Sequence, residues 1–132
     1  MKDKPLHIII PGVLPGLNEY VRANRANPHT GSQMSRQAHA LCRTGMIRYN
    51  GRQVKRARIV FRWVEKNKRR DKDNVAFAKK FILDALQETG ILKNDGWEEV
   101  AGFTDEFAVN RKYPHVEVLI YEEGGNNDSN QQ

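Results

Sequence analysis

The spacing of apolar residues changes twice along the second half of this chain, and this change constrains the fold more than any other feature. Between residues 58 and 65 the side chains alternate, and Ile59, Phe61 and Trp63 form one richly apolar face, which is the pattern of a strand. Residues 75–86 instead carry apolar side chains at helical spacing. Alternation returns over residues 116–120. These changes of period predict helices packed against a sheet.

The other expected elements follow from the same patterns and from turn residues. The central helix is expected to begin near Asp73 or Asn74 and to stop at Gly90. Further strands are expected at residues 6–10, about 100–109 and 115–121. An earlier helix is expected from Ser32 or Ser35 to about Arg48. Residues 15–30 and 93–97 are expected to form loops. The order is β-α-β-α-β-β. We therefore expect an α+β fold, a mixed β-sheet packed with two main helices.

The length and composition predict one domain. The chain has 132 residues, and we expect the domain to cover residues 1–122, with a disordered polar tail at 123–132. The apolar stretch near the start is too short and too broken by proline and glycine to serve as a membrane span or a signal segment. A single cysteine, Cys42, excludes an intrachain disulfide. We expect a cytoplasmic protein without a membrane anchor.

The basic charge is concentrated in one block. Residues 22–72 contain fifteen Lys and Arg but only two acidic residues, Glu65 and Asp71. Such a block is typical of proteins that neutralise phosphates, so nucleic acid is the expected partner, with an anionic membrane surface a distant second and a merely solubilising surface the plain alternative. Aromatic residues are sparse in the block, which favours duplex or branched DNA over single strands.

Three aspartates are the candidates for chemistry. Asp71 and Asp73 follow the most basic run of the chain at the expected helix entry, and Asp95 lies just past the helix. Converging carboxylates suit Mg²⁺, with Mn²⁺ possible in its place, and such an ion can activate water against a phosphodiester. The structural alternative is that Asp73 or Asn74 caps the helix and that Asp95 is a turn residue.

One lysine of the expected helix is placed to join these carboxylates. Seven positions separate Lys80 from Asp73, so a continuous helix brings both to nearly the same face, whereas Lys79 points toward the apolar stripe. Lys80 could then contact the scissile phosphate or the leaving oxygen. Its alternative role, equally compatible with the spacing, is an ion pair with Asp84 four residues later.

These residues form an ordered set of motifs. The chain reads Arg-Arg-Asp-Lys-Asp-Asn at residues 69–74, Phe-Ile-Leu-Asp-Ala-Leu at 81–86, Gly-Ile at 90–91 and Asn-Asp at 94–95. The set resembles the RusA family of Holliday junction resolvases, and Pro-Gly-Leu-Asn-Glu-Tyr at 15–20 is similar to the family's proline-led Asn-x-Tyr motif. The resemblance extends from about Leu6 to Tyr121. The chain differs from the family's pattern at two places. Asn94 replaces the first member of an Asp-Asp pair, and the interval between Asn74 and Asp84 is longer than in the family.

The resemblance implies a homodimeric, Mg²⁺-dependent endodeoxyribonuclease that resolves four-way DNA junctions by paired nicks. It implies Asp71, Asp73 and Asp95 as the metal-binding, catalytic carboxylates, and Lys80, reached by counting back from Asp84, as the essential lysine. The candidate DNA-contacting residues are Asn18, Lys66, Lys68, Arg69, Arg70 and Asn74. Because two symmetric nicks need two sites, one such domain is expected to act as a twofold dimer, with the segment from Leu14 to Asn27 as a candidate contact with DNA or the second subunit.

Two other functions compete with this hypothesis. A non-catalytic DNA-binding module would explain the basic block but not the three spaced carboxylates. A restriction-type nuclease would need an acidic residue followed two positions later by lysine, and the chain has none.

Overall fold

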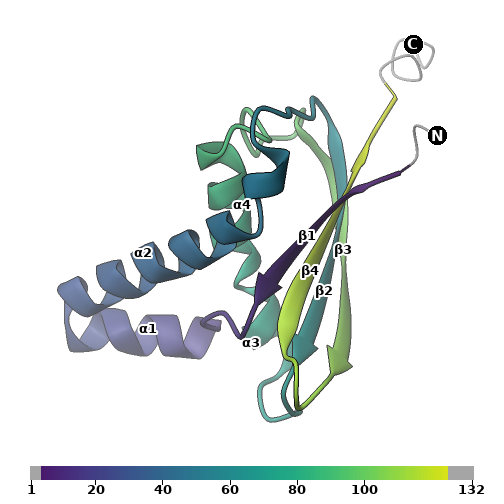
Figure 1. Ribbon diagram of the computed structural model, residues 1–132. Helices are drawn as coiled ribbons and strands as arrows, with labels where there is room; N and C mark the ends of the chain where they lie inside the picture. The colour runs from purple at the N-terminus through teal and green to yellow at the C-terminus, as the bar shows by residue number, and fades with distance from the viewer. Residues whose placement is uncertain (1–3, 125–132) are drawn as a thin grey trace.

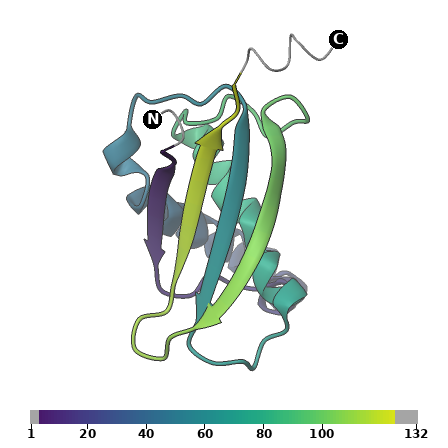
Figure 2. The same ribbon diagram turned by 90° about the vertical axis from the view of Figure 1, so that its right-hand side faces the viewer.

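A four-stranded mixed sheet forms one layer of the molecule. The computed structural model describes residues 4–124. Its strands are β1 (Leu6–Pro11), β2 (Ala57–Glu65), β3 (Val100–Val109) and β4 (His115–Glu122). They lie in the order β1-β4-β2-β3, in which β2 and β3 are parallel and the other neighbours are antiparallel. Figure 2 views this sheet face-on, with β1 and β3 at its two edges.

The helices form a second layer on one face of the sheet (Figure 1). They are α1 (Leu17–Ala26), α2 (Pro28–Thr44), the short 3-10 helix η1 (Ile47–Tyr49), α3 (Lys72–Ala76) and α4 (Lys79–Glu88). The core between the layers includes the predicted apolar face of β2, with Ile59, Phe61 and Trp63 all at most 1% exposed. The expected α+β class is therefore confirmed.

All four strands lie within a residue of the predicted positions. For β2 the reason is direct, because apolar alternation on a half-covered sheet follows from the two-residue repeat of a strand. Cys42 belongs to the core as well, and burial raises the pKa of its thiol to about 12. No helix within residues 4–124 has the length and hydropathy needed to cross a membrane. Most of the predicted tail, residues 125–132, lies outside the described part of the chain.

The loop predicted at residues 15–30 is wrong. The segment forms α1 and the beginning of α2, and Figure 1 shows the two as a helical hairpin that projects from the sheet. The start of α2 is fixed by Asn27, whose side chain accepts a hydrogen bond from the His29 N–H at 2.8 Å, and by Pro28 at the first helical position. The predicted start at Ser32 or Ser35 is wrong for the same reason. The helix also ends earlier than predicted, at Thr44.

The helix predicted to begin near Asp73 or Asn74 and to stop at Gly90 begins and ends close to those positions, but its continuity is wrong, because a turn at Phe77 and Ala78 divides it into α3 and α4. Three i-to-i+3 hydrogen bonds tighten the chain here, from the amides of Ala78, Lys80 and Phe81 to the carbonyls three residues earlier. The tighter winding keeps Val75, Ala78 and Phe81, which are three residues apart, buried in the core. It also removes the continuous helix on which the shared face of Asp73 and Lys80 was predicted.

Candidate active site

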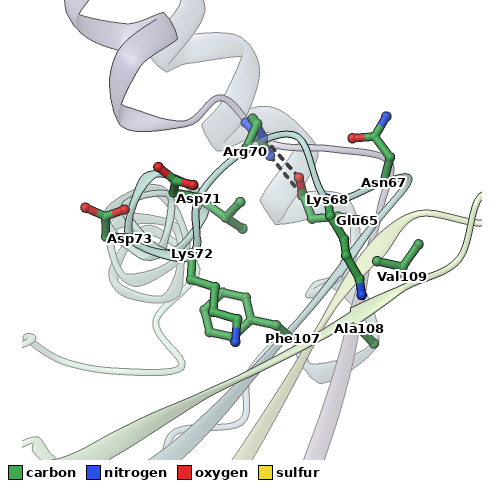
Figure 3. Close-up of a pocket in the computed structure, with 11 residues that line it drawn as sticks. Glu65, Asn67, Lys68, Arg70, Asp71, Lys72, Asp73, Phe107, Ala108 and Val109 are labelled. Atoms are coloured by element: carbon green, nitrogen blue, oxygen red, sulfur yellow. Dashed lines mark hydrogen bonds and ion pairs between the residues drawn. The ribbon is translucent and has the colours of Figure 1, made fainter.

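The end of the sheet at which β2 and β3 both finish carries the largest concentration of the predicted site residues. The chain leaves β2 at Glu65, passes through a loop at residues 66–71 and enters α3. A cavity of about 800 Å³ lies between this loop, the start of α3 and the end of β3. The residues that line it are Glu65, Asn67, Lys68, Arg70, Asp71, Lys72, Asp73, Val75, Phe107, Ala108 and Val109 (Figure 3).

Asp71 and Asp73 line this cavity together. Figure 3 shows both carboxylates pointing away from Lys72. The Asp73 Oδ1 accepts a hydrogen bond from the Asn74 N–H at 2.9 Å, which fixes that side chain at the first turn of α3. Asp71 occupies the N-cap position of α3, yet its side chain makes no capping hydrogen bond, and no other hydrogen bond or ion pair within residues 4–124 reaches it. Capping therefore does not account for the Asp71 carboxylate.

Arg70 holds the loop in place. Its guanidinium donates two hydrogen bonds to Glu65, at 3.0 and 2.8 Å, and two more to the Leu14 carbonyl at 3.1 Å and the Glu19 carboxylate at 3.2 Å. Burial alone would lower the pKa of Arg70, but the hydrogen bonds and charges of Glu65 and Glu19 outweigh it and raise the pKa above its usual value. These contacts occupy the guanidinium, so Arg70 acts as a clamp between the loop and the start of α1.

Asn74 has a similar role. Its side chain is 9% exposed, and its Oδ1 accepts a hydrogen bond from the Asn18 N–H at 2.8 Å. The contact joins the N-terminal ends of α1 and α3, so the two asparagines that were predicted to meet DNA meet each other. The side chain of Asn18 itself is exposed.

Positive side chains surround the cavity. Lys66, Lys68 and Arg69 are exposed on the loop, and Arg111 and Lys112 are exposed in the turn between β3 and β4 at the same end of the sheet. The two segments are joined where the Asn110 N–H donates to the Glu65 carbonyl at 2.8 Å. A neighbouring hollow is lined by Lys66, Arg69 and Arg111 together. The predicted basic loop therefore borders the predicted carboxylates.

Asp95 lies at the other end of the sheet. Its loop leads into the start of β3, where the Ala57 N–H at the start of β2 donates to the Glu99 carbonyl at 2.7 Å. Since β2 has nine residues, at roughly 3.3 Å per residue its two ends are about 26 Å apart. Within residues 4–124 no three His, Cys, Asp or Glu side chains form a group that could hold a metal ion. The fold of a single chain therefore brings Asp71 and Asp73 together but not Asp95.

Neither lysine at the start of α4 lines the cavity. Lys79 turns toward the sheet, where its Nζ lies 2.7 Å from the Asp105 carboxylate and 4.1 Å from the centre of the Phe103 ring. Lys80 lies beside Tyr20 and Phe81, and its Nζ is 3.9 Å from the Asp84 carboxylate. The pairing with Asp84 that the spacing allowed is thus present.

Lys72 and Phe107 are among the cavity residues that the sequence analysis did not single out. Lys72 lies between the two aspartates in the chain, and its ammonium lies 5.5 Å from the centre of the Phe107 ring (Figure 3). Its position between Asp71 and Asp73 is the sequence signal that could have identified it. Phe107 carried no signal, because a phenylalanine in a strand is indistinguishable from an ordinary core residue until its neighbours are known.

The two carboxylates fit a magnesium ion. Mg²⁺ in proteins is usually held by one or two carboxylates, with water and substrate phosphate oxygens as its other ligands. Asp71 and Asp73 are exposed, and neither forms an ion pair among the described residues, so their oxygens are available to a hard cation.

Two comparisons with known proteins were negative. Neither the models of protein families nor the curated proteins include a match to this chain.

Proposed function

We propose that this chain is a Mg²⁺-dependent endodeoxyribonuclease that resolves four-way DNA junctions, as its resemblance to the RusA family implies. The observation that carries the proposal is that Asp71 and Asp73, neither of which forms an ion pair within residues 4–124, line one cavity bordered by exposed lysines and arginines. The cations attract the DNA backbone, and the carboxylates supply what a phosphodiesterase needs to hold a divalent ion.

The proposed roles follow from the contacts. Lys66, Lys68 and Arg69 hold phosphates beside the cavity, and the Arg70 clamp keeps their loop in one conformation. When bound by Asp71 and Asp73, Mg²⁺ would supply a water of lowered pKa and polarise the phosphoryl oxygen. The Asn74 N–H keeps the Asp73 carboxylate oriented before DNA arrives, so less ordering is needed on binding. Lys80 is the implied essential lysine, although its ammonium lies outside the cavity in the free chain.

Replacement of either aspartate tests this function. Asp71→Asn and Asp73→Asn each remove one negative ligand but keep the shape, so nicking of a synthetic four-way junction in Mg²⁺ should fall by at least a hundredfold. Binding of the same junction without metal should persist or strengthen, because the repulsion of the phosphates decreases. Glu88→Gln, at an exposed carboxylate paired with Arg43, is the matched control and should retain wild-type nicking. Undiminished nicking by Asp73→Asn would refute the proposal.

The main alternative, a non-catalytic DNA-binding module, predicts a different result. Such a protein would bind the junction and leave it uncut at every Mg²⁺ and Mn²⁺ concentration. Asp71 would then be only a helix cap, a role that its side chain does not perform.

A further inference from the structure

The loop at residues 66–71 separates two hollows. One is the cavity that Asp71 and Asp73 line. The other, which we call the second hollow, has a volume of about 500 Å³ and lies between the loop, the start of α1 and the turn between β3 and β4. The two have three lining residues in common, Glu65, Asn67 and Arg70. These three residues therefore form the wall between the hollows.

The cations of the loop are divided between the two hollows. Lys68 lines the cavity and not the second hollow, whereas Lys66 and Arg69 line the second hollow and not the cavity. Arg111 joins Lys66 and Arg69 from the turn between β3 and β4. All four side chains are exposed, and none forms an ion pair within residues 4–124. Each hollow therefore has positive charges of its own that are free to bind phosphates.

The two hollows differ in net charge. The cavity is lined by three basic and three acidic residues, so its charges balance. The second hollow is lined by four basic and two acidic residues, a net charge of +2. Its two acids, Glu19 and Glu65, accept hydrogen bonds from Arg70 at 3.2 and 2.8 Å, so neither carboxylate is free to bind a metal ion. The second hollow therefore suits a phosphate that is held without a metal ion and is not cut.

The wall between the hollows is held in one conformation. The Arg70 guanidinium joins Glu65, at the base of the loop, to the Leu14 carbonyl in the segment before α1 (Figure 3). Nearer the tip, the Asn67 Oδ1 accepts a hydrogen bond from the Arg69 N–H at 3.0 Å. A loop that is fixed at its base and near its tip is already ordered when DNA binds on both of its sides.

We propose that this loop lies at the branch point of a DNA junction, between two strands that pair in one arm and separate there. The inference rests on the proposed nuclease function, because it assigns the cut strand to the cavity of Asp71 and Asp73. The other strand enters the second hollow, where Lys66, Arg69 and Arg111 bind its phosphates and leave it uncut. The loop thus selects branched DNA over linear duplex.

The selection follows from how the two kinds of DNA present their backbones. In a linear duplex, base pairs join the two strands everywhere, so a strand held in the cavity keeps its partner on the far side of a groove. At a branch no base pair joins the two strands, and each can follow its own side of the loop. The linear duplex therefore occupies the cavity alone, and the junction occupies both hollows.

Helix α1 extends the second hollow away from the cavity. Glu19 lines the hollow from α1, and Arg22 is its neighbour on the helix surface, three residues further along. Arg22 is exposed and forms no ion pair within residues 4–124. Because the α1–α2 hairpin projects from the sheet (Figure 1), it gives the uncut strand a path that diverges from the strand in the cavity.

Affinity for two DNA substrates tests this arrangement without any nicking. The substrates are a synthetic four-way junction and a linear duplex of the same arm sequence, both in buffer without divalent metal. Lys66→Ala/Arg111→Ala removes two cations from the second hollow. Its junction affinity should fall by at least about tenfold, and the slope of log affinity against log salt should decrease by about two. Its affinity for the duplex should change by less than about twofold, because only the cavity holds the duplex.

Lys68→Ala/Lys72→Ala is the matched control, since it removes two cations from the cavity instead. It should weaken the binding of junction and duplex by the same factor, because both substrates place a strand in the cavity. Equal losses of junction and duplex affinity for Lys66→Ala/Arg111→Ala would overturn the proposal, since the loop would then lie in a groove of intact duplex. A junction affinity that this variant leaves unchanged would overturn it as well.

Photo-cross-linking identifies the strand on each side of the loop. Lys66→Cys and Lys68→Cys are each modified with an azidophenacyl group, and the native Cys42 is buried and stays unmodified. On a junction with one strand labelled at a time, the two positions should attach to different strands, with Lys68→Cys on the nicked one. Attachment of both to the same strand would overturn the proposal even if Asp73-dependent nicking is observed. Attachment to different strands by a protein that never nicks would instead refute the nuclease function and retain the loop at the branch point.

Discussion

At the scale of single residues, the structure separates side chains that are free to act from side chains that hold the fold. Asp71, Lys66 and Lys68 are exposed beside the cavity. Two neighbours in the same motif, Arg70 and Asn74, instead form hydrogen bonds with other parts of the chain. The motif could therefore be found from the sequence, but the division of roles within it could not, because it depends on where Leu14, Glu19 and Asn18 lie in space.

The two adjacent lysines at the start of α4 should differ in the same way. Lys79 is 18% exposed and pairs with Asp105, which also accepts a hydrogen bond from the Trp63 indole at 2.9 Å. Lys79→Ala leaves that half-buried carboxylate without its counter-charge and should lower the free energy of unfolding by about 1–3 kcal/mol. Lys80→Ala should change it by less than about 0.5 kcal/mol, because its ion pair is long and exposed.

Nicking activity should rank Lys79→Ala and Lys80→Ala in the order opposite to their stability. If Lys80 is the essential lysine, Lys80→Ala should lose nicking while it melts like wild type, and Lys79→Ala should keep its turnover at a temperature where it stays folded. Urea titration and nicking assays on both proteins check this. A Lys80→Ala enzyme with wild-type turnover would remove that residue from the site and favour Lys72, which lines the cavity.

At the scale of elements, the sequence predicted the strands better than the helices. A strand half-covered by helices repeats every two residues, and β2 carries this repeat in its own side chains. The break between α3 and α4 has no such local mark, since neither glycine nor proline occurs between Asp73 and Thr89. The helix α1 is hard to predict because the proline and glycine before it and Pro28 after it are typical of loops, although Asn27-Pro28 is also a helix start.

The junction of α1 and α3 gives a prediction at this scale. Asn74→Ala removes the acceptor of the Asn18 N–H, which is part-buried, and should destabilise the protein by about 1–2 kcal/mol. Gly16 lies against the same group, since a Cβ at this position would be only 2.8 Å from the Asn74 Oδ1. Asn50→Ala, at an exposed turn, is the control and should melt as wild type does. Equal melting temperatures for the two variants would show that this contact does not join the helices.

At the scale of the whole molecule, the place of Asp95 follows from strand direction. Because β2 and β3 are parallel, the helices between them must return along the sheet, so the loop before α3 and the loop after α4 lie at opposite ends. The sequence predicted a mixed sheet but not which strands are parallel. Had that direction been known, the separation of Asp95 from Asp71 and Asp73 would have been predicted too.

The distribution of charge over the molecule sets the salt dependence of DNA binding. Exposed cations from two loops, Lys66, Lys68 and Arg69 in one and Arg111 and Lys112 in the other, gather at the end of the sheet that carries Asp71 and Asp73. Each phosphate they neutralise releases counterions, so junction affinity should fall steeply between about 50 and 200 mM salt.

Charge reversal shows which cations produce this dependence. Lys66→Glu/Lys68→Glu/Arg69→Glu should weaken binding and reduce the slope of log affinity against log salt by about one for each lost contact. Arg52→Glu, an exposed residue that precedes β2 at the other end of the sheet, makes the matched comparison because it changes the net charge without touching the basic loop. If both proteins lost affinity in proportion to net charge alone, DNA would be attracted by the molecule as a whole. A slope that changes only for the triple variant assigns the contacts to the loop beside the two carboxylates.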